Sequence, residues 1–249
     1  MNTVDKLTPA KPTSTLVFLH YFGGEAKSWQ WVTPHLEKDY PCICLNLPGF
    51  GGTPPLKETS ITAMAQWVLR ELALLDVYDC ILIGHSMSGK IALQVASMPT
   101  ELTVRQLILV APSPPTTEPM PDSEKKRMLK HPDPNEAEQT VKNASQYQLD
   151  PKRKAFAIQS QLKIDQQTWQ WWLTTGMDHS ILKNVKQIKA PITVITSLED
   201  PVITQELIEN EVMAHLPHAD LITCKGPGHL LPLEVPDWVA QKIKSKLEV

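Results

Sequence analysis

Ser86 lies at a point in the sequence where a serine could act as a nucleophile. The stretch CILIGHSMSGKIALQVA, residues 80–96, starts with an apolar run typical of a buried parallel strand and continues as a helical apolar stripe after Met87. The small residues between the two elements predict a very tight turn, which strains its central residue and directs that side chain outward. The following helix N-terminus would favour negative charge beside the hydroxyl. Purely structural turns also use glycine and serine, so this turn alone does not identify a nucleophile. The rest of the chain must be searched for the catalytic partners of Ser86.

A nucleophilic serine needs an imidazole to take its proton and a third group to hold that imidazole. Asp200 follows the apolar run at residues 191–196, in the loop SLEDP, and His229 follows the run at 220–224, in KGPGHLLP. Alone, the aspartate would be read as a turn or helix-capping residue and the histidine as a solvated surface group. Their order and their shared position after late strands predict a triad of Ser86, Asp200 and His229.

Strand patterns and helix patterns alternate along the chain. This alternation predicts an α/β fold, with a mostly parallel central sheet covered by helices on both faces. Ligands of such sheets bind at the carboxyl ends of the strands, where all three candidate residues fall. The expected strands are 15–19, 42–47, 80–83, 106–111, 191–196 and 220–224, and helical apolar faces cover 61–75, 208–216 and 239–247.

The middle of the chain has a different pattern. Five prolines between residues 112 and 121 end the regular structure, and polar helical segments follow. We interpret residues 114–180 as a cap insertion above the sheet, within a single domain that spans 1–249. Trp169, Trp171 and Trp172 form the aromatic concentration of this insertion. Packing between the insertion and the core is favoured over substrate contact for them.

Composition argues against several other functions. The net charge of −3 and the lack of a basic block give no reason to expect a nucleic-acid or anionic-membrane partner. We expect no secretory signal at the N-terminus, and no apolar run approaches the roughly 20 residues that span a bilayer. The four cysteines form no C-x-x-C pair, which favours buried, reduced thiols and a cytoplasmic location.

Other reactive residues receive simpler interpretations. His215 and His218 lack a third ligand at matching spacing, so we expect surface histidines and no metal site. The glycines of FGG and GFGG lack a phosphate-loop pattern, and no cofactor is predicted. Lys90, on the helix after Ser86, is expected to reach solvent, and His20 is expected to brace a loop beside the site.

The chain resembles the α/β-hydrolase family outside residues 114–180. Residues 84–88, GHSMS, match the family's G-x-S-x-G elbow with serine in the last position, and the family order of serine, acid and histidine is reproduced. LHYFGG, residues 19–24, occupies the place of the family's His-Gly loop, with Tyr21 at a usual glycine. The resemblance implies an oxyanion hole made by the backbone N–H groups of Phe22 and Met87. In LNLPGFGGT, Asn46 stands where an aspartate is frequent.

These observations predict a cofactor-free serine hydrolase acting on carboxylic esters. We expect a small-molecule substrate with an apolar acyl group, in contact with Tyr21, Phe22, Met87 and Leu230. A serine at the elbow disfavours the epoxide-opening and halide-displacing chemistries, for which family members use aspartate. Two alternatives would keep the same triad. One is an enzyme that cleaves a carbon–carbon bond or a lactone or transfers an acyl group, and the other is a slow-turnover receptor or signalling protein.

Overall fold

The computed structural model describes residues 14–247. Residues 1–13, where we expect no signal sequence, and residues 248–249 lie outside the described part of the chain. Within residues 14–247, none of the helices has the length and apolar character needed to cross a bilayer.

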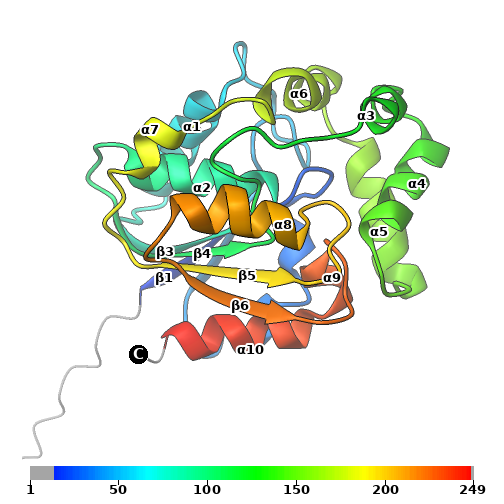
Figure 1. Ribbon diagram of the computed structural model, residues 1–249. Coiled ribbons are helices and arrows are strands. Elements are labelled where there is room, and N and C mark those ends of the chain that lie inside the picture. The colour runs from blue at the N-terminus through cyan, green and yellow to red at the C-terminus, as the bar shows by residue number, and fades with distance from the viewer. Residues whose placement is uncertain (1–13, 248–249) are drawn as a thin grey trace, which may run out of the picture.

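A six-stranded, fully parallel sheet forms the centre of the protein (Figure 1). Its strand order is β2-β1-β3-β4-β5-β6, so the chain reverses direction across the sheet between β1 and β3. β1 and β3 are apolar and buried, as expected for strands covered on both faces. The strands are β1 (Thr15–Leu19), β2 (Cys42–Leu45), β3 (Asp79–His85), β4 (Thr103–Val110), β5 (Ile192–Ser197) and β6 (Asp220–Cys224).

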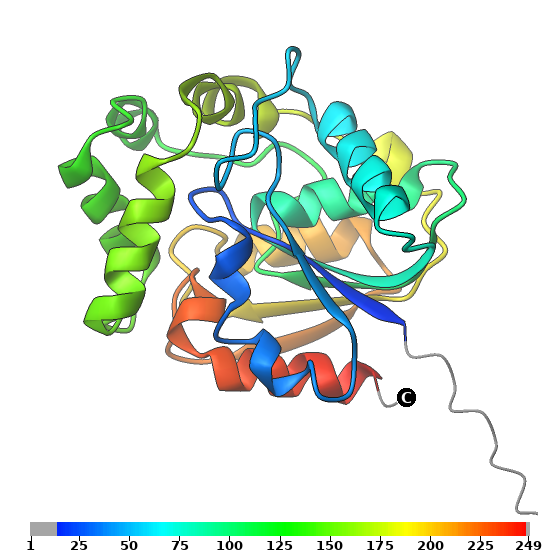
Figure 2. The ribbon, with the colours of Figure 1, turned by 180° about the vertical axis from the view of Figure 1, so that it is seen from behind.

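Helices cover both faces of the sheet (Figures 1 and 2). α1, α2, α7 and α8 lie on one face, and α10 lies on the other with the short turns η1 and η2. Each face has its own buried cluster. The bounds are η1 (Ala26–Trp29), η2 (Thr33–His35), α1 (Ile61–Leu74), α2 (Met87–Ser97), α7 (Leu182–Val185), α8 (Gln205–Leu207), η4 (Ile208–Val212), η5 (Met213–His215), α9 (Leu231–Glu234) and α10 (Pro236–Leu247).

Between β4 and β5 the chain forms a group of helices beside and above the carboxyl ends of the strands (Figure 1). We call residues 114–180 the cap segment. Asp133, Asp150 and Asp165 begin three of its helices by accepting hydrogen bonds from backbone N–H groups of the first turn. The elements are α3 (Asp122–Met128), α4 (Pro134–Ala144), α5 (Pro151–Leu162), α6 (Gln166–Trp171) and the π-turn η3 (Trp172–Gly176).

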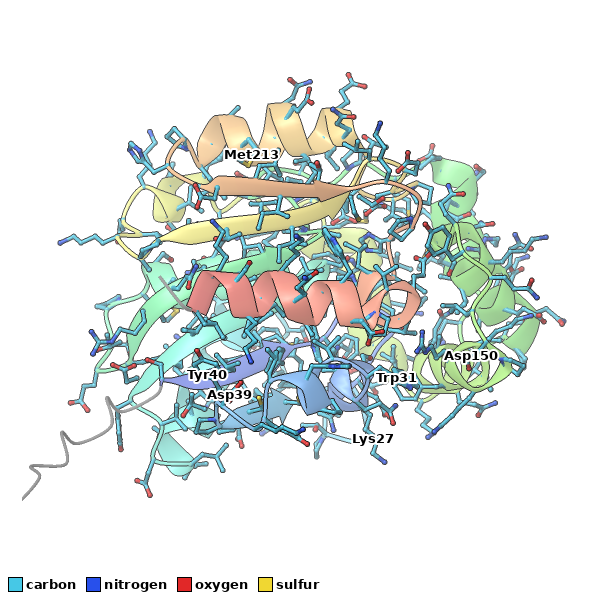
Figure 3. All side chains as sticks on the ribbon, turned by 90° about the horizontal axis from the view of Figure 1, so that it is seen from below. Lys27, Trp31, Asp39, Tyr40, Asp150 and Met213 are labelled. Atoms are coloured by element: carbon cyan, nitrogen blue, oxygen red, sulfur yellow. The ribbon has the colours of Figure 1, made fainter. Side chains whose placement is uncertain are left out.

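A second contact between the cap segment and the rest of the protein lies on the underside of the sheet (Figure 3). α10 crosses this side, and Trp31, after η1, lies next to the cap helices. The ring of Trp31 meets Phe156 edge-on at 5.2 Å between centroids, and the guanidinium carbon of Arg153 lies 5.7 Å from the Trp31 centroid. Both partners belong to α5, so an aromatic contact ties this helix to the segment after β1.

Three expectations about local structure need correction. The strand predicted over 42–47 ends at Leu45, because the backbone N–H of Leu47 turns away to bond His20. The helix predicted over 208–216 is instead the π-turn η4 followed by the 3-10 turn η5, and the short helix α8 precedes them. All four cysteines are free, but Cys80 alone among them is fully buried; the others are half-buried.

Candidate active site

Ser86 lies in the tight turn between β3 and α2. Its φ of 55° and ψ of −120° are strained for a residue with a side chain. Small neighbours make this possible, since a Cβ atom on Gly84 would lie 2.4 Å from the carbonyl oxygen of Ser88, and one on Gly89 would lie 2.5 Å from Pro112. Two backbone hydrogen bonds fix the strained residue to β4 and to the segment after it. The N–H of Ser86 donates to Val110 O at 2.9 Å, and the carbonyl oxygen of Ser86 accepts the N–H of Ser113 at 3.0 Å.

Ser86, His229 and Asp200 form one continuous hydrogen-bonded chain. Nε2 of His229 lies 2.7 Å from Ser86 Oγ, and Nδ1 of His229 lies 2.8 Å from Asp200 Oδ2. Asp200 cannot turn away, because its other oxygen accepts the backbone N–H groups of Val202 and Ile203 at 2.8 and 2.9 Å. The side chains of His229 and Asp200 are 5% and 0% exposed, so water does not compete for their hydrogen bond. The structure therefore brings together all three residues that the sequence selected.

Two opposing effects set the pKa of His229. Burial disfavours the imidazolium, whereas the charge and hydrogen bond of Asp200 and the charges of Glu118 and Glu234 favour it. The net result is a pKa above the ordinary histidine value. His85, whose Nε2 lies 2.9 Å from the carbonyl oxygen of His229, behaves in the opposite way. Its burial and the neighbouring His229 hold the pKa of His85 well below the ordinary value, so His85 is a neutral support.

The two candidate oxyanion donors lie in the loop after β1, which contains Phe22, and at the start of α2, where Met87 follows Ser86. In the described part of the chain, the backbone N–H groups of Phe22 and Met87 donate to no protein acceptor. His20 braces this loop as expected: its Nε2 accepts the N–H of Leu47 at 3.1 Å, so Nδ1 carries the proton that is donated to Tyr21 O at 2.9 Å. Burial lowers the pKa of His20 to about 4, which keeps the ring neutral.

Two of the three departures from the family pattern, Ser88 and Asn46, make specific side-chain hydrogen bonds. The hydroxyl of Ser88 donates to the carbonyl oxygen of His20 and ties the elbow to the loop after β1, which a glycine could not do. Asn46 accepts the N–H of Ala26 at 2.6 Å through Oδ1 and donates to Gly51 O at 3.3 Å through Nδ2. An aspartate could accept but, when ionised, could not donate, so the amide links two loops.

Glu234 holds the backbone on both sides of His229, a role that the sequence analysis missed. Its Oε2 accepts the N–H of Gly228 at 2.9 Å and its Oε1 accepts that of Leu230 at 3.1 Å. Oε2 also accepts the N–H groups of Gln146 and Tyr147 from the cap segment, at 3.0 and 2.8 Å. The His229 N–H donates to Ala144 O at 2.8 Å. The spacing of a glutamate five residues after a candidate histidine was the signal available in the sequence.

Lys90 does not reach solvent, which corrects the expectation from the sequence. Its side chain is fully buried, and Nζ donates to the carbonyl oxygens of Thr116, Met177 and His179 at 2.9, 3.0 and 3.1 Å. Burial lowers the pKa of Lys90 to about 8, against the opposing charges of Glu118 and Asp178. Both ends of the cap segment are thus tied to α2, the helix that begins beside Ser86.

A cavity of about 350 Å³ opens onto the hydroxyl of Ser86 and the ring of His229. The expected contact residues Tyr21, Phe22 and Leu230 line it, whereas Met87 is buried in the core and offers only its backbone. Trp172 lines the cavity, which the packing interpretation of the tryptophans did not anticipate. Trp169 does pack: it stacks on Phe22 with 4.2 Å between centroids, and its indole N–H donates to Met128 O at 2.8 Å. Trp171 is partly buried against the hydrophobic cluster that contains Trp169 and Trp172.

Comparisons with known proteins identify a family and relatives of this chain. A model of the alpha/beta hydrolase family matches residues 16–242. The chain is 35% identical to the pimeloyl-[acyl-carrier protein] methyl ester esterase of Klebsiella pneumoniae over 114 residues, 46% of this chain and 42% of that protein. It is 26% identical to the uncharacterized hydrolase YugF of Bacillus subtilis over 255 aligned positions, 92% and 88% of the two chains.

The fold agrees with solved structures. The esterase EaEST from Exiguobacterium antarcticum superposes with a TM-score of 0.85 at 17% identity, covering 95% of this chain and 92% of that one. The chain spans only 22–42% of the length of several curated relatives that it matches at about 35% identity. The family match, however, extends over nearly the whole described chain. The protein belongs to the alpha/beta hydrolase family.

Proposed function

We propose that this protein is a serine hydrolase that cleaves carboxylic esters through an acyl-enzyme intermediate. The observation that carries the proposal is the unbroken chain from Ser86 Oγ through the ring of His229 to Asp200, at the edge of a cavity large enough for a small ester. A serine, an imidazole and a carboxylate in this order are the groups that acyl transfer requires. The names of relatives such as the Klebsiella methyl ester esterase support the same reaction class.

In the acylation step, His229 acts as the general base. Its Nδ1–H donates to Asp200, so in the neutral ring Nε2 is free to accept the hydroxyl proton of Ser86 at 2.7 Å. Ser86 Oγ then forms a bond to the acyl carbon, and the carbonyl electron pair moves to the oxygen. The backbone N–H groups of Phe22 and Met87 stabilise this oxyanion, each by roughly 3 kcal/mol. The imidazolium then gives its proton to the departing alcohol as the carbon–oxygen bond breaks.

Deacylation repeats these steps with water. His229 removes a proton from a water molecule, whose oxygen attacks the acyl carbon, and then returns the proton to Ser86 Oγ as the acid leaves. Asp200 stabilises the imidazolium in both steps through its hydrogen bond to Nδ1 of His229. The side chain of His85 keeps the carbonyl of His229 fixed at 2.9 Å, so the ring returns to the same position after each transfer. The groups of this chain supply every proton movement, and the proposal includes no cofactor.

The direct test is a covalent probe together with an ester panel. The protein is incubated with a fluorophosphonate, and its intact mass and the modified peptide are measured, with Ser86→Ala as the control. 4-Nitrophenyl esters of increasing acyl length are assayed in parallel. One adduct on Ser86 with rapid ester turnover supports the proposal. An adduct with barely any turnover favours acyl transfer or a receptor role instead, and the absence of an adduct contradicts Ser86 as the nucleophile.

A further inference from the structure

The wall of the cavity contains a buried carboxyl group that the ester-hydrolase mechanism does not use. Glu118 is 5% exposed and lines the cavity together with Ser86 and His229. No hydrogen-bond partner is present for its Oε2 atom among residues 14–247. The hydroxyl of Ser113 lies close enough to influence its pKa, but that oxygen is also without a partner in ordinary hydrogen-bond geometry. Buried polar atoms are almost always paired in folded proteins, so this group calls for an explanation.

The neighbouring carboxylate on the cavity wall is different. Glu124, on α3, accepts hydrogen bonds from the guanidinium of Arg127, and the side chain of Thr140 is also bonded by Arg127. Their polar atoms therefore already have protein partners. Glu118 instead lies in the segment that connects β4 to α3, where its backbone N–H donates a hydrogen bond to Met177 O at 2.8 Å. Its position is set by the backbone, and its side chain forms part of the cavity wall.

The geometry points to Glu118 as the residue that selects the substrate: we propose that it hydrogen-bonds a hydroxyl group carried by the ester. This inference rests on the proposed ester hydrolysis and deepens it, because it names hydroxyl-bearing carboxylic esters as the preferred class. The purely apolar substrate expected from the sequence would cover the Glu118 carboxyl group without offering it a hydrogen bond. An unpaired buried acceptor is costly, and a partner on the substrate removes that cost.

A hydroxyl group fits this site in either protonation state of the carboxyl. Burial raises the pKa of Glu118, although the charges of Lys90 and His229 act in the opposite direction. The neutral acid is therefore populated at a higher pH than for an exposed glutamate. The neutral acid offers both a donor and an acceptor, whereas the carboxylate only accepts. A hydroxyl can donate to either form and can also accept from the acid. A substrate carboxylate, by contrast, would meet a like charge beside Asp200.

A structural explanation competes with this one. The charge of Glu118 favours the protonated form of the buried Lys90, so the carboxyl could serve only as a distant counter-charge for that ammonium. The two explanations differ in what Gln and Leu at position 118 should do. A glutamine keeps a donor and an acceptor but loses the charge, whereas a leucine loses all three. Selection by hydrogen bonding predicts that Glu118→Gln retains the preference and that Glu118→Leu loses it.

The experiment compares matched esters in the full-length protein. Methyl pentanoate is assayed against its 3-, 4- and 5-hydroxy derivatives, and butyl butanoate against 4-hydroxybutyl butanoate, by acid release in a pH-stat. We expect at least one hydroxy ester to exceed its unsubstituted partner in kcat/KM. Glu118→Leu should reduce that ratio by roughly ten-fold or more, the usual effect of losing one buried hydrogen bond. Glu118→Gln should stay within about three-fold of wild type, and Glu124→Gln, which changes an already paired carboxylate, should keep the ratio.

The outcomes separate failure of this inference from failure of the hydrolase proposal. Fluorophosphonate labelling of Ser86 in every variant shows that the site is folded. If Ser86 is labelled and the esters are hydrolysed, but wild type shows no hydroxyl preference, the selection role is wrong. An equal ratio in wild type and Glu118→Leu overturns it too. If Glu118→Leu does not fold, the wild-type panel and Glu118→Gln still decide, because a lost preference in Glu118→Gln contradicts hydrogen bonding. No labelling and no hydrolysis in wild type would instead refute the proposed function.

Discussion

The sheet region and the cap segment contribute to the same site with different parts of the chain. The loops at the strand ends supply side chains, namely Ser86, Asp200 and His229. Where the cap segment meets these loops, it supplies mainly backbone groups. Its carbonyl oxygens accept hydrogen bonds from the ammonium group of Lys90 and from the backbone N–H of His229. Its backbone N–H groups donate to the carboxylate of Glu234.

This difference predicts where substitutions will matter. A backbone group survives almost any change of its own side chain, so the cap residues that bond Lys90 and Glu234 should tolerate substitution. Their partners, the two side chains on the sheet region, have no substitute. The contrast can be tested with changes that range from the triad itself to the electrostatic surroundings of His229.

The largest effect is expected for Asp200→Asn. The amide can donate to Nδ1 of His229, which favours the tautomer with its proton on Nε2 and leaves no base facing Ser86. We expect kcat to fall by about 10⁴-fold with little change in the melting temperature. Steady-state ester hydrolysis measures this effect. A loss below ten-fold would mean that a different carboxylate orients His229.

Glu234→Gln should produce the next largest effect. One amide cannot replace a carboxylate that accepts four backbone N–H groups, two of which flank His229. We expect a fall in kcat of about 10- to 100-fold at a similar KM, because small misplacement of a catalytic group has effects of this size.

Glu199→Gln is the matched control for Glu234→Gln. Glu199 accepts one backbone N–H, that of Gly226 at 2.7 Å, in the same loop. The same chemical change there should alter kcat less than three-fold. Equal losses in the two variants would show that Glu234 has no special role in positioning His229.

Lys90→Met should affect the cap segment more than the chemistry. It removes a buried ammonium that bonds three carbonyl oxygens at both ends of the cap segment. Leaving these acceptors unpaired should cost about 3 kcal/mol of stability, which corresponds to a decrease of roughly 6–12 °C in the melting temperature. KM should rise more than kcat falls.

Lys125→Met provides the comparison for Lys90→Met. Lys125 is a cap-segment lysine whose partner is the carboxylate of Asp178, at 3.6 Å and close to the surface. Such pairs contribute at most about 1 kcal/mol, so the melting temperature should change little. If the two variants unfold at the same temperature, the buried ammonium group of Lys90 does not stabilise the attachment of the cap segment to α2.

The smallest effect concerns pH. The pKa of His229 lies above the ordinary 6.5, and only the neutral ring can take the proton of Ser86. Activity should therefore fall as the pH decreases through that raised pKa, with the midpoint of kcat/KM above 6.5. Glu234→Gln, which removes one of the charges that raise this pKa, should move the midpoint toward lower pH. A wild-type midpoint below 6.5 would contradict the electrostatic account.

The sequence predicted the parallel sheet and the meeting of Ser86, Asp200 and His229 because these depend on local patterns. Apolar runs mark buried strands, and residues that follow parallel strands share one edge of the sheet. The bracing role of His20 was predicted from its place beside the site, although its partner Leu47 lies in another loop. The burial of Lys90 was not predicted: on a helix its spacing suits solvent, and only the fold shows that backbone carbonyls from residues 116, 177 and 179 surround it.

The cap segment was harder to predict because its contacts leave weak signals in the sequence. Its helices are polar and short, and its bonds to the site use the backbone of Ala144, Gln146 and Tyr147. One signal was present but unused. The Asp-Pro pairs at 133–134 and 150–151 place a capping carboxylate before a proline at the first helical position, and both begin helices. The place of Glu118 on the cavity wall depends on tertiary structure alone.

The central claim is that Ser86 is the nucleophile of an ester hydrolase, and the most direct test is the rate of hydrolysis by Ser86→Ala. The account predicts a loss of kcat on the order of 10⁴- to 10⁶-fold with the melting temperature preserved, since among residues 14–247 the hydroxyl bonds only His229. Turnover within ten-fold of wild type, in protein of confirmed mass, would contradict it.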